Sequence, residues 1–346
     1  MPEPVAAARR EAATRLFGIS DPRIAEVSGI ARGLRSADVY WVHNDSGHAA
    51  SLFALDARTG AVRGVYSVSG VTNVDWEDVA VALDARGVAS IWIADIGDND
   101  ATRSEVRIYR VDEPAVPESA TTGRTSAADE WRLRYPDGPR DAEALAVAPG
   151  GAMWIFDKVV FGSTQAFRVP AIPDSRRARA VTPVGRFLTR DTGTRGGPGP
   201  IGRLTVTGAA LNRTGTVLAI RTYTDAYVWP VRGGDIAAAL RTSPVVAALP
   251  AQPQGEGISV VGARMVLDGE GAGAQVWSVP LPALSTESQA GAGGTTGRST
   301  GSSRSSVSSE VPRPARTALL PLGAAGVVGL VLAGGLALAR ARRRSR

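Results

Sequence analysis

Four glutamates stand at the head of short stretches in which apolar residues alternate with small or polar ones; they are Glu26, Glu77, Glu143 and Glu256. A fifth stretch of the same kind opens with Thr207. A fold that arranges such repeats around one axis brings the carboxylates together. Crowded carboxylates repel one another unless a cation compensates them, and Ca²⁺ takes about six to eight oxygen ligands. We therefore expect a cation, Ca²⁺, at some of these glutamates. The alternative is that they accept hydrogen bonds from backbone N–H groups at strand starts.

If the protein is an enzyme, carboxylates also have to provide its catalytic groups. The chain has no cysteine, no Gly-x-Ser-x-Gly elbow and no phosphate-binding loop,. The remaining chemistries are metal-assisted hydrolysis and a paired acid and base, as in glycosidases. For this reading the candidate catalytic residues are Glu77, Glu143, Asp98 and Lys158, the last being the single lysine beside 38 arginines.

The two histidines, His43 and His48, flank a short polar segment. A zinc site using both is one interpretation, and a solvated turn at a strand end is the one we expect. Ser28 or Ser46 beside a histidine would be needed for a Ser-His-acid triad, for which the sequence holds no local motif,.

Five repeats have to position these residues, with starts at 26, 77, 143, 207 and 256. Each contains an alternating run, a turn, a second run and a third run, which is typical of antiparallel strands. Fourth strands are expected at 62–68, 131–135, 181–188 and 245–249. The fifth repeat has none, and residues 14–19 have nothing else to pair with. The pattern predicts an all-β, five-bladed β-propeller over residues 13–284, closed by the N-terminal strand. A β-sandwich is the alternative, although it would not need five similar repeats.

The repeats carry a family resemblance. Glu26-Val-Ser-Gly-Ile30 with His43-Asn-Asp-Ser-Gly47, and Asp75-Trp-Glu-Asp-Val79 with Asp95-Ile-Gly-Asp-Asn99, resemble segments of bacterial propeller proteins described as WD40-like, SdiA-regulated-type or esterase-like phytase. The resemblance covers about residues 21–282. It implies a propeller and export, and the phytase description implies Ca²⁺-dependent cleavage of phosphoesters.

The C-terminal part predicts a membrane anchor. Residues 317–339 are an uncharged run rich in Leu, Val, Ala and Gly, long enough to span a bilayer as a helix,. The basic residues 340–346 predict a cytoplasmic tail, which would leave the propeller outside the cell,. Residues 285–316, rich in Ser, Thr and Gly, are expected to form a flexible stalk, and residues 1–12 to be disordered,. No signal peptide precedes the propeller, so we expect an upstream start; the other possibility is a cytosolic propeller,.

The charge of the chain lies mainly in this C-terminal part. The net charge is +6, and residues 285–346, with nine Arg and two Glu, carry +7, which leaves the other 284 residues near neutral. A near-neutral domain argues against a nucleic-acid partner. We expect a monomeric, membrane-anchored, extracellular propeller that binds a small molecule, peptide or glycan. The alternative is a metal-dependent extracellular hydrolase of phosphoesters or glycans.

Overall fold

The computed structural model describes residues 12–284. The predicted stalk, membrane helix and basic tail, and all but the last residue of the predicted N-terminal disordered segment, lie outside this range. Among the described residues, no helix combines the length and the apolar character that a bilayer crossing requires.

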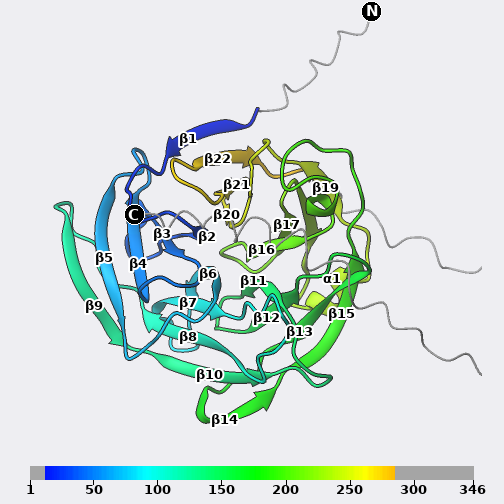
Figure 1. Cartoon of the computed structure of the whole chain (residues 1–346), viewed down its shortest axis with the longest axis horizontal. Coiled ribbons are helices and arrows are strands. Elements are labelled where there is room, and N and C mark those ends of the chain that lie inside the picture. The colour runs from blue at the N-terminus through cyan, green and yellow to red at the C-terminus, as the bar shows by residue number, and fades with distance from the viewer. Residues whose placement is uncertain (1–11, 285–346) are drawn as a thin grey trace, which may run out of the picture. The chain divides into compact units, whose positions relative to one another are not determined.

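The described residues form five antiparallel sheets of four strands each, with a parallel fifth strand added to two of them. Figure 1 shows the sheets standing around a common axis, so the predicted five-bladed propeller is confirmed. Blade 1 consists of β2 (Val27–Arg32), β3 (Val39–Asn44), β4 (Ser51–Asp56) and β5 (Val62–Ser69), and blade 2 of β6 (Trp76–Leu83), β7 (Ala89–Asp95), β8 (Val106–Asp112) and β10 (Asp129–Arg134). Blade 3 consists of β11 (Ala142–Val147), β12 (Met153–Asp157), β13 (Ser163–Arg168) and β15 (Thr182–Leu188), and blade 4 of β16 (Val206–Leu211), β17 (Val217–Thr222), β18 (Asp225–Pro230) and β19 (Val245–Ala248). Blade 5 consists of β20 (Ile258–Val261), β21 (Arg264–Leu267), β22 (Gln275–Pro280) and β1 (Thr14–Gly18).

The hydrophobic core is divided among the contacts between blades. Each of five clusters of buried side chains joins two neighbouring blades. Trp92 of blade 2 and Phe167 of blade 3 belong to one cluster, and Trp41 of blade 1 and Trp76 of blade 2 belong to another. Both faces of a blade are therefore buried, which explains why the middle strands are almost continuously apolar.

The ring is closed by the N-terminal strand, as expected from the sequence. Strand β1 pairs antiparallel with β22, and the register runs from Thr14 opposite Ser278 to Gly18 opposite Gln275. The last blade is thus made from both ends of the propeller, which removes two free sheet edges.

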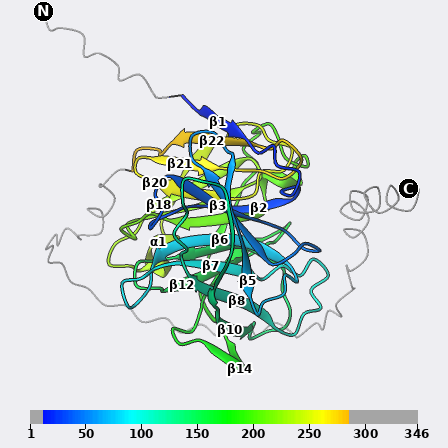
Figure 2. The same cartoon turned by 90° about the vertical axis from the view of Figure 1, so that its left-hand side faces the viewer.

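The outer edges of three blades are covered by the chain that follows. Strand β9 (Thr121–Ala127) belongs by sequence to blade 2 but pairs in parallel with β5 of blade 1. Strand β14 (Asp174–Ala180) leaves blade 3 and pairs with β10 of blade 2, at the periphery in both views (Figure 1 and Figure 2). In blade 4 the equivalent connection holds helix α1 (Ile236–Leu240), which packs on β15 of blade 3. In blades 2, 3 and 4, the connection between the third and fourth strands therefore covers the outer edge of the preceding blade.

Candidate functional site

The innermost strands carry a bulge at the same place. In blades 1 to 4 the register with the second strand skips one residue: Ser28, Glu77, Glu143 and Thr207. Glu256 holds the corresponding place in blade 5, just before Gly257, whose carbonyl accepts from the Asp268 N–H. A bulge leaves its extra residue out of the ladder and re-aims the side chain. Four of these five residues make contacts between blades: Ser28 Oγ donates to Glu77 Oε2 (3.2 Å), and Thr207 Oγ1 donates to the Glu256 carbonyl (3.1 Å).

This register corrects the alignment of the first repeat, in which Glu26 was matched with Glu77. Ser28 occupies that position, and Glu26 lies two residues earlier, where blade 3 has Asp141. The backbone shows the equivalence, because Asp45 N–H donates to the Glu26 carbonyl as Lys158 N–H donates to that of Asp141. The side chain of Glu26 is 45% exposed and pairs with His48 at 3.3 Å. Glu26 is therefore a rim residue. The bulge recurs at the same place in blades 1 and 2, and the offset arises because matching the repeats by their glutamates shifts the first repeat by two residues.

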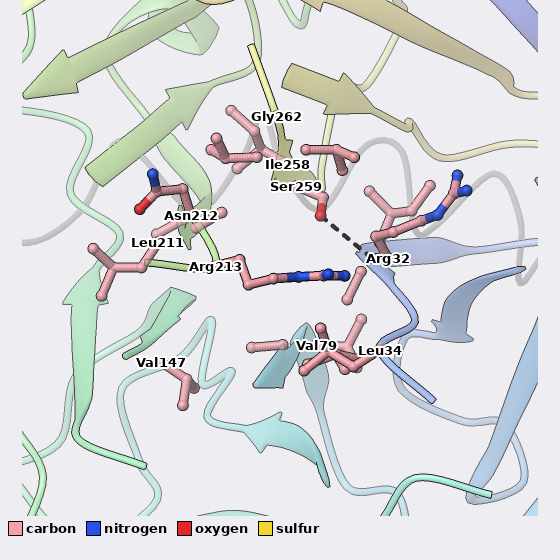
Figure 3. A pocket seen from close by; sticks show the side chains of 18 of the residues that line it. Arg32, Leu34, Val79, Val147, Leu211, Asn212, Arg213, Ile258, Ser259 and Gly262 are labelled. Atoms are coloured by element: carbon pink, nitrogen blue, oxygen red, sulfur yellow. Dashed lines mark hydrogen bonds between the residues drawn. The ribbon is translucent and has the colours of Figure 1, made fainter. Parts of the chain in front are cut away.

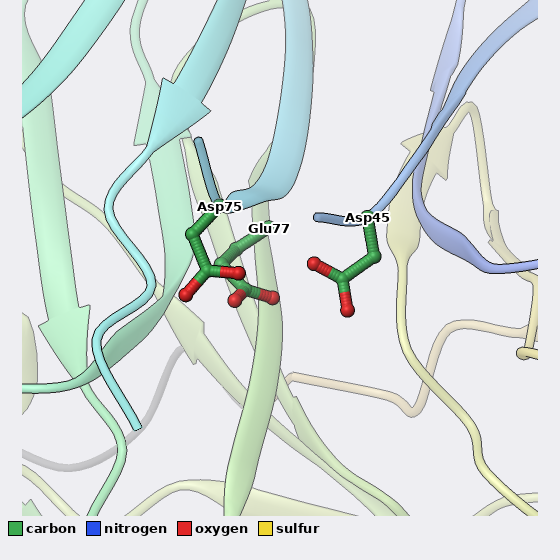
Figure 4. Close-up of side chains that lie close together, drawn as sticks. All are labelled: Asp45, Asp75 and Glu77. Carbon is green, nitrogen blue, oxygen red and sulfur yellow. The ribbon is translucent and has the colours of Figure 1, made fainter. Parts of the chain in front are cut away.

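Three carboxylates meet at one mouth of the ring, at the start of the inner strands. Asp45 follows β3, while Asp75 and Glu77 flank the first residue of β6 (Figure 4). Each offers an oxygen within 4.8 Å of the others, so the group could hold a metal ion. Only Glu77 belonged to the predicted metal set. Asp45 and Asp75 were missed because repeat alignment favoured one acid per blade, whereas two of these three come from blade 2.

The backbone around the three carboxylates is fixed by buried polar side chains. Asn73 donates through Nδ2 to the Asp45 carbonyl (2.8 Å), which joins the loops of blades 1 and 2. Asp95 Oδ1 accepts from the Asp75 N–H (3.2 Å) and is held in turn by Arg103 (2.7 Å). Asp95, the last residue of β7, therefore positions the site without belonging to it, whereas Asp45 at the end of β3 is one of its three carboxylates.

Gly97 provides the space that the carboxylates occupy. A Cβ at this position would overlap Glu77 Oε1 and lie 2.5 Å from Asp75 Oδ2. The φ angle of Gly97 is not positive, so the backbone does not require glycine here. The requirement is the close approach of two acidic side chains.

The surroundings of Asp45, Asp75 and Glu77 disfavour the ionised forms of these three carboxyl groups. Burial raises the pKa of Asp45 to about 8, and the charges of Asp75 and Glu143 add to the effect. Burial likewise raises the pKa of Glu77 well above its usual value, with further contributions from Glu143 and Asp45. The pKa of Asp75 is raised by burial and by Asp141. Repulsion of this kind is relieved either by protons or by a bound cation.

An ion pair lies beside this group. Lys158 Nζ bonds to Glu143 Oε1, with 13% and 5% of the two side chains exposed. Burial raises the pKa of Glu143 to about 7 against the lowering effect of Lys158. Glu256 adds a further buried carboxyl whose Oε2 has no hydrogen-bond partner among residues 12–284. Burial and the charge of Glu143 raise the pKa of Glu256 well above its usual value. The acidic groups named at this mouth therefore outnumber the basic group of Lys158.

The other predicted residues lie apart from this group. The carboxylate of Asp98 accepts from the N–H groups of Thr102 (2.9 Å) and Arg103 (2.8 Å), so it closes its own loop. His43 is fully buried with its ring edge against Trp76, while His48 lies on the rim. Neither histidine belongs to a group of three potential metal ligands in the described part of the chain.

Asp78 occupies the centre of the ring below the acids, a role that was not predicted from the sequence. Its Oδ2 accepts from the N–H groups of Leu145 in blade 3 (2.8 Å) and Ala209 in blade 4 (3.1 Å). The equivalent residues of the other blades are small, and a Cβ on Gly29 would lie 2.8 Å from the Val79 nitrogen. The acidic mouth therefore has a closed floor made by Asp78 and the inner strands.

The sequence matches no protein-family model and no curated protein. Solved structures similar to the chain include the PQQ-bound aldose sugar dehydrogenase of Streptomyces coelicolor, with 12% identity, coverage of 79% of this chain and 99% of that one, and a TM-score of 0.43. A gluconolactonase of Xanthomonas campestris has 14% identity, 78% and 89% coverage, and a TM-score of 0.40. The apo-form soluble aldose sugar dehydrogenase of Escherichia coli has 13% identity, 77% and 98% coverage, and a TM-score of 0.40. At these identities the likeness concerns the fold alone.

Proposed function

We propose that the protein is a ligand-binding propeller whose acidic mouth holds Ca²⁺ through Asp45, Asp75 and Glu77. The observation that carries the proposal is the convergence of these three carboxylates within 4.8 Å, in surroundings that disfavour their unpaired charges. The orphaned Oε2 of Glu256 is a second buried acceptor without a donor near the same mouth. A bound cation would neutralise the three carboxylates and give Glu256 Oε2 a positively charged neighbour.

The donor set fits a hard cation. All three side chains offer oxygen only, which suits Ca²⁺ or Mg²⁺ and not a thiolate- or imidazole-preferring metal. Three carboxylates supply between about three and six of the six to eight oxygens that Ca²⁺ takes. The remaining positions are available to the oxygens of a ligand, for which a phosphoester or a glycan is the natural class.

The second candidate function is hydrolysis of such a ligand, and the ion pair of Glu143 and Lys158 favours it. A bound cation would supply Lewis-acid activation of the scissile group. With a pKa of about 7, Glu143 is able to accept and return a proton near neutral pH, and Lys158 holds its carboxylate in place,. Both residues are among the candidate catalytic residues predicted from the sequence.

We also propose that the propeller acts at the outer cell surface, anchored by residues 317–339. The support is the uncharged 23-residue run followed by five arginines in the last seven residues,. Protease added to intact cells should degrade the propeller; full protection, with degradation only after lysis, would place it inside.

Thermal unfolding of the purified full-length chain tests the cation site. With Ca²⁺ at about 100 times its Kd, binding to the native state adds about 2.7 kcal/mol, and Tm should rise. Glu77→Gln should abolish the rise while leaving a folded protein, since it removes a charge and keeps the shape. An unchanged Tm of the wild type with both Ca²⁺ and Mg²⁺ would refute the metal centre. Phosphoester and glycan substrates, assayed with wild type and Glu143→Gln, then separate binding from hydrolysis.

A further inference from the structure

A second cavity lies at the opposite end of the inner strands. It has a volume of about 450 Å³ and is bordered by residues of the inner strands, among them Val79, Val147, Ala209 and Ile258 (Figure 3). All four are buried apolar residues. The volume falls within the range of small-molecule sites, about 300–1,000 Å³. Asp78 and the closely packed inner strands separate this cavity from the acidic mouth.

The charged lining of this cavity is entirely basic. Arg32 and Arg213 border it, and none of the bordering residues is acidic. Arg213 stands in the turn between β16 and β17, and its side chain extends across the cavity toward Arg32 and Ser259 (Figure 3). It has no hydrogen-bond or ion-pair partner among residues 12–284. The turn does not need it, because Asn212 Oδ1 already accepts from the N–H groups of Thr216 and Val217.

Arg32 borders the same space, but its guanidinium is turned away from Arg213 and is held against blade 1 (Figure 3). Its Nε donates to the Ala37 carbonyl (2.6 Å), and its guanidinium carbon lies 4.7 Å from the centre of the Tyr40 ring. These contacts leave its terminal amino groups without a partner in the described part of the chain. The guanidinium of Arg213 over an apolar lining matches a ligand with one negative end and one apolar end.

We propose that this cavity binds a small organic anion with an apolar body, whose charged group bonds to Arg213. The apolar body packs against the inner strands around Val79 and Ile258. The hydroxyl of Ser259, which accepts from the Arg32 N–H (3.3 Å), is placed to donate its proton to the same anionic group. This site is independent of the proposed cation centre.

Calorimetric titration of the full-length protein with decanoate, in the presence of chelator, tests the proposal without involving the cation centre. Decanoate should bind, and Arg213→Gln should weaken binding at least about tenfold, since a hydrogen bond to a charged group is lost. Arg213→Lys should retain most of the affinity. The matched control is Arg58→Gln, another exposed turn arginine, which should leave binding unchanged.

Two further probes separate the parts of the proposed ligand. Inorganic phosphate, which has no apolar body, and decanol, which has no charge, should each bind more weakly than decanoate. Equal binding of decanol and decanoate would overturn the role of Arg213, and equal binding of phosphate would overturn the role of the apolar lining. The proposal also fails if the wild type does not bind decanoate, or if Arg213→Gln binds it as the wild type does.

Discussion

Gly97 and Glu77 are in such close contact that any side chain on residue 97 would displace the Glu77 carboxylate. Gly97→Ala should therefore weaken Ca²⁺ binding about tenfold or more, since a misplaced ligand loses a charge-assisted contact. Calorimetric titration with Ca²⁺ measures the change. Gly185→Ala is the control, because its Cβ would meet Leu240 at an ordinary 3.4 Å and its φ is not positive. Equal loss in both variants would contradict the role given to Gly97.

The raised pKa values make Ca²⁺ affinity depend on pH. Asp45, with a pKa of about 8, and Glu143, with a pKa of about 7, hold protons that a cation has to displace or repel. Ca²⁺ affinity should rise as pH increases from 6 to about 9, and binding should release protons. Titrations in buffers of different ionisation enthalpy count the protons. A flat affinity over this range would show that the acids are already ionised.

Without a cation, stability should respond to pH in the opposite direction. The pKa of Asp45 is higher in the folded protein, at about 8, than its usual 3.8, so the folded state binds more protons between these values. The free energy of unfolding then falls as pH rises through this window. Chemical denaturation in chelator at pH 5 and pH 8 measures the loss, and Glu77→Gln, which removes one of the interacting charges, should reduce it.

Asp78 should be one of the residues on which folding depends most. Asp78→Ala leaves the buried N–H groups of Leu145 and Ala209 without an acceptor and opens a space at the centre of the ring. We expect a loss of about 2–5 kcal/mol in the free energy of unfolding. Asp78→Asn, which keeps one acceptor oxygen and the shape, should cost less. Denaturant titration compares the two, and a loss below 1 kcal/mol for alanine would contradict the bridging role.

Lys158 stabilises Glu143, and its loss should affect folding and cation binding differently. Lys158→Met leaves a buried carboxyl without its partner and should destabilise the protein by about 3–5 kcal/mol,. At pH 9 the same variant should bind Ca²⁺ more tightly, because a positive charge has left the acidic mouth. Adding Glu143→Gln to Lys158→Met should recover much of the stability, and a failure to do so would mean that the pair is not coupled.

The sequence predicted the blades better than their connections. Alternating apolar residues and regular spacing indicated the five blades, and the unpaired stretch near Thr14 indicated the closure. Strands β9 and β14 were not predicted, because their sequences are polar and show no apolar alternation. They form strands because the edge of a neighbouring blade is available for pairing. The acids were recognised as a group, but Glu26 was matched with Glu77 although Ser28 holds the equivalent position. Strand pairing decides between these two alignments, and a single sequence does not show it.

The covering of one blade's outer edge by the next blade has a mechanical consequence. Repeat arrays whose units touch only their neighbours are able to fray from one end. Here the outermost strands of blades 1 and 2 come from the following blade, and the outer edge of blade 3 is covered by a helix of blade 4. Unfolding one blade would remove the strand or helix that covers the outer edge of its neighbour. The propeller should therefore unfold cooperatively, in a single sharp thermal transition.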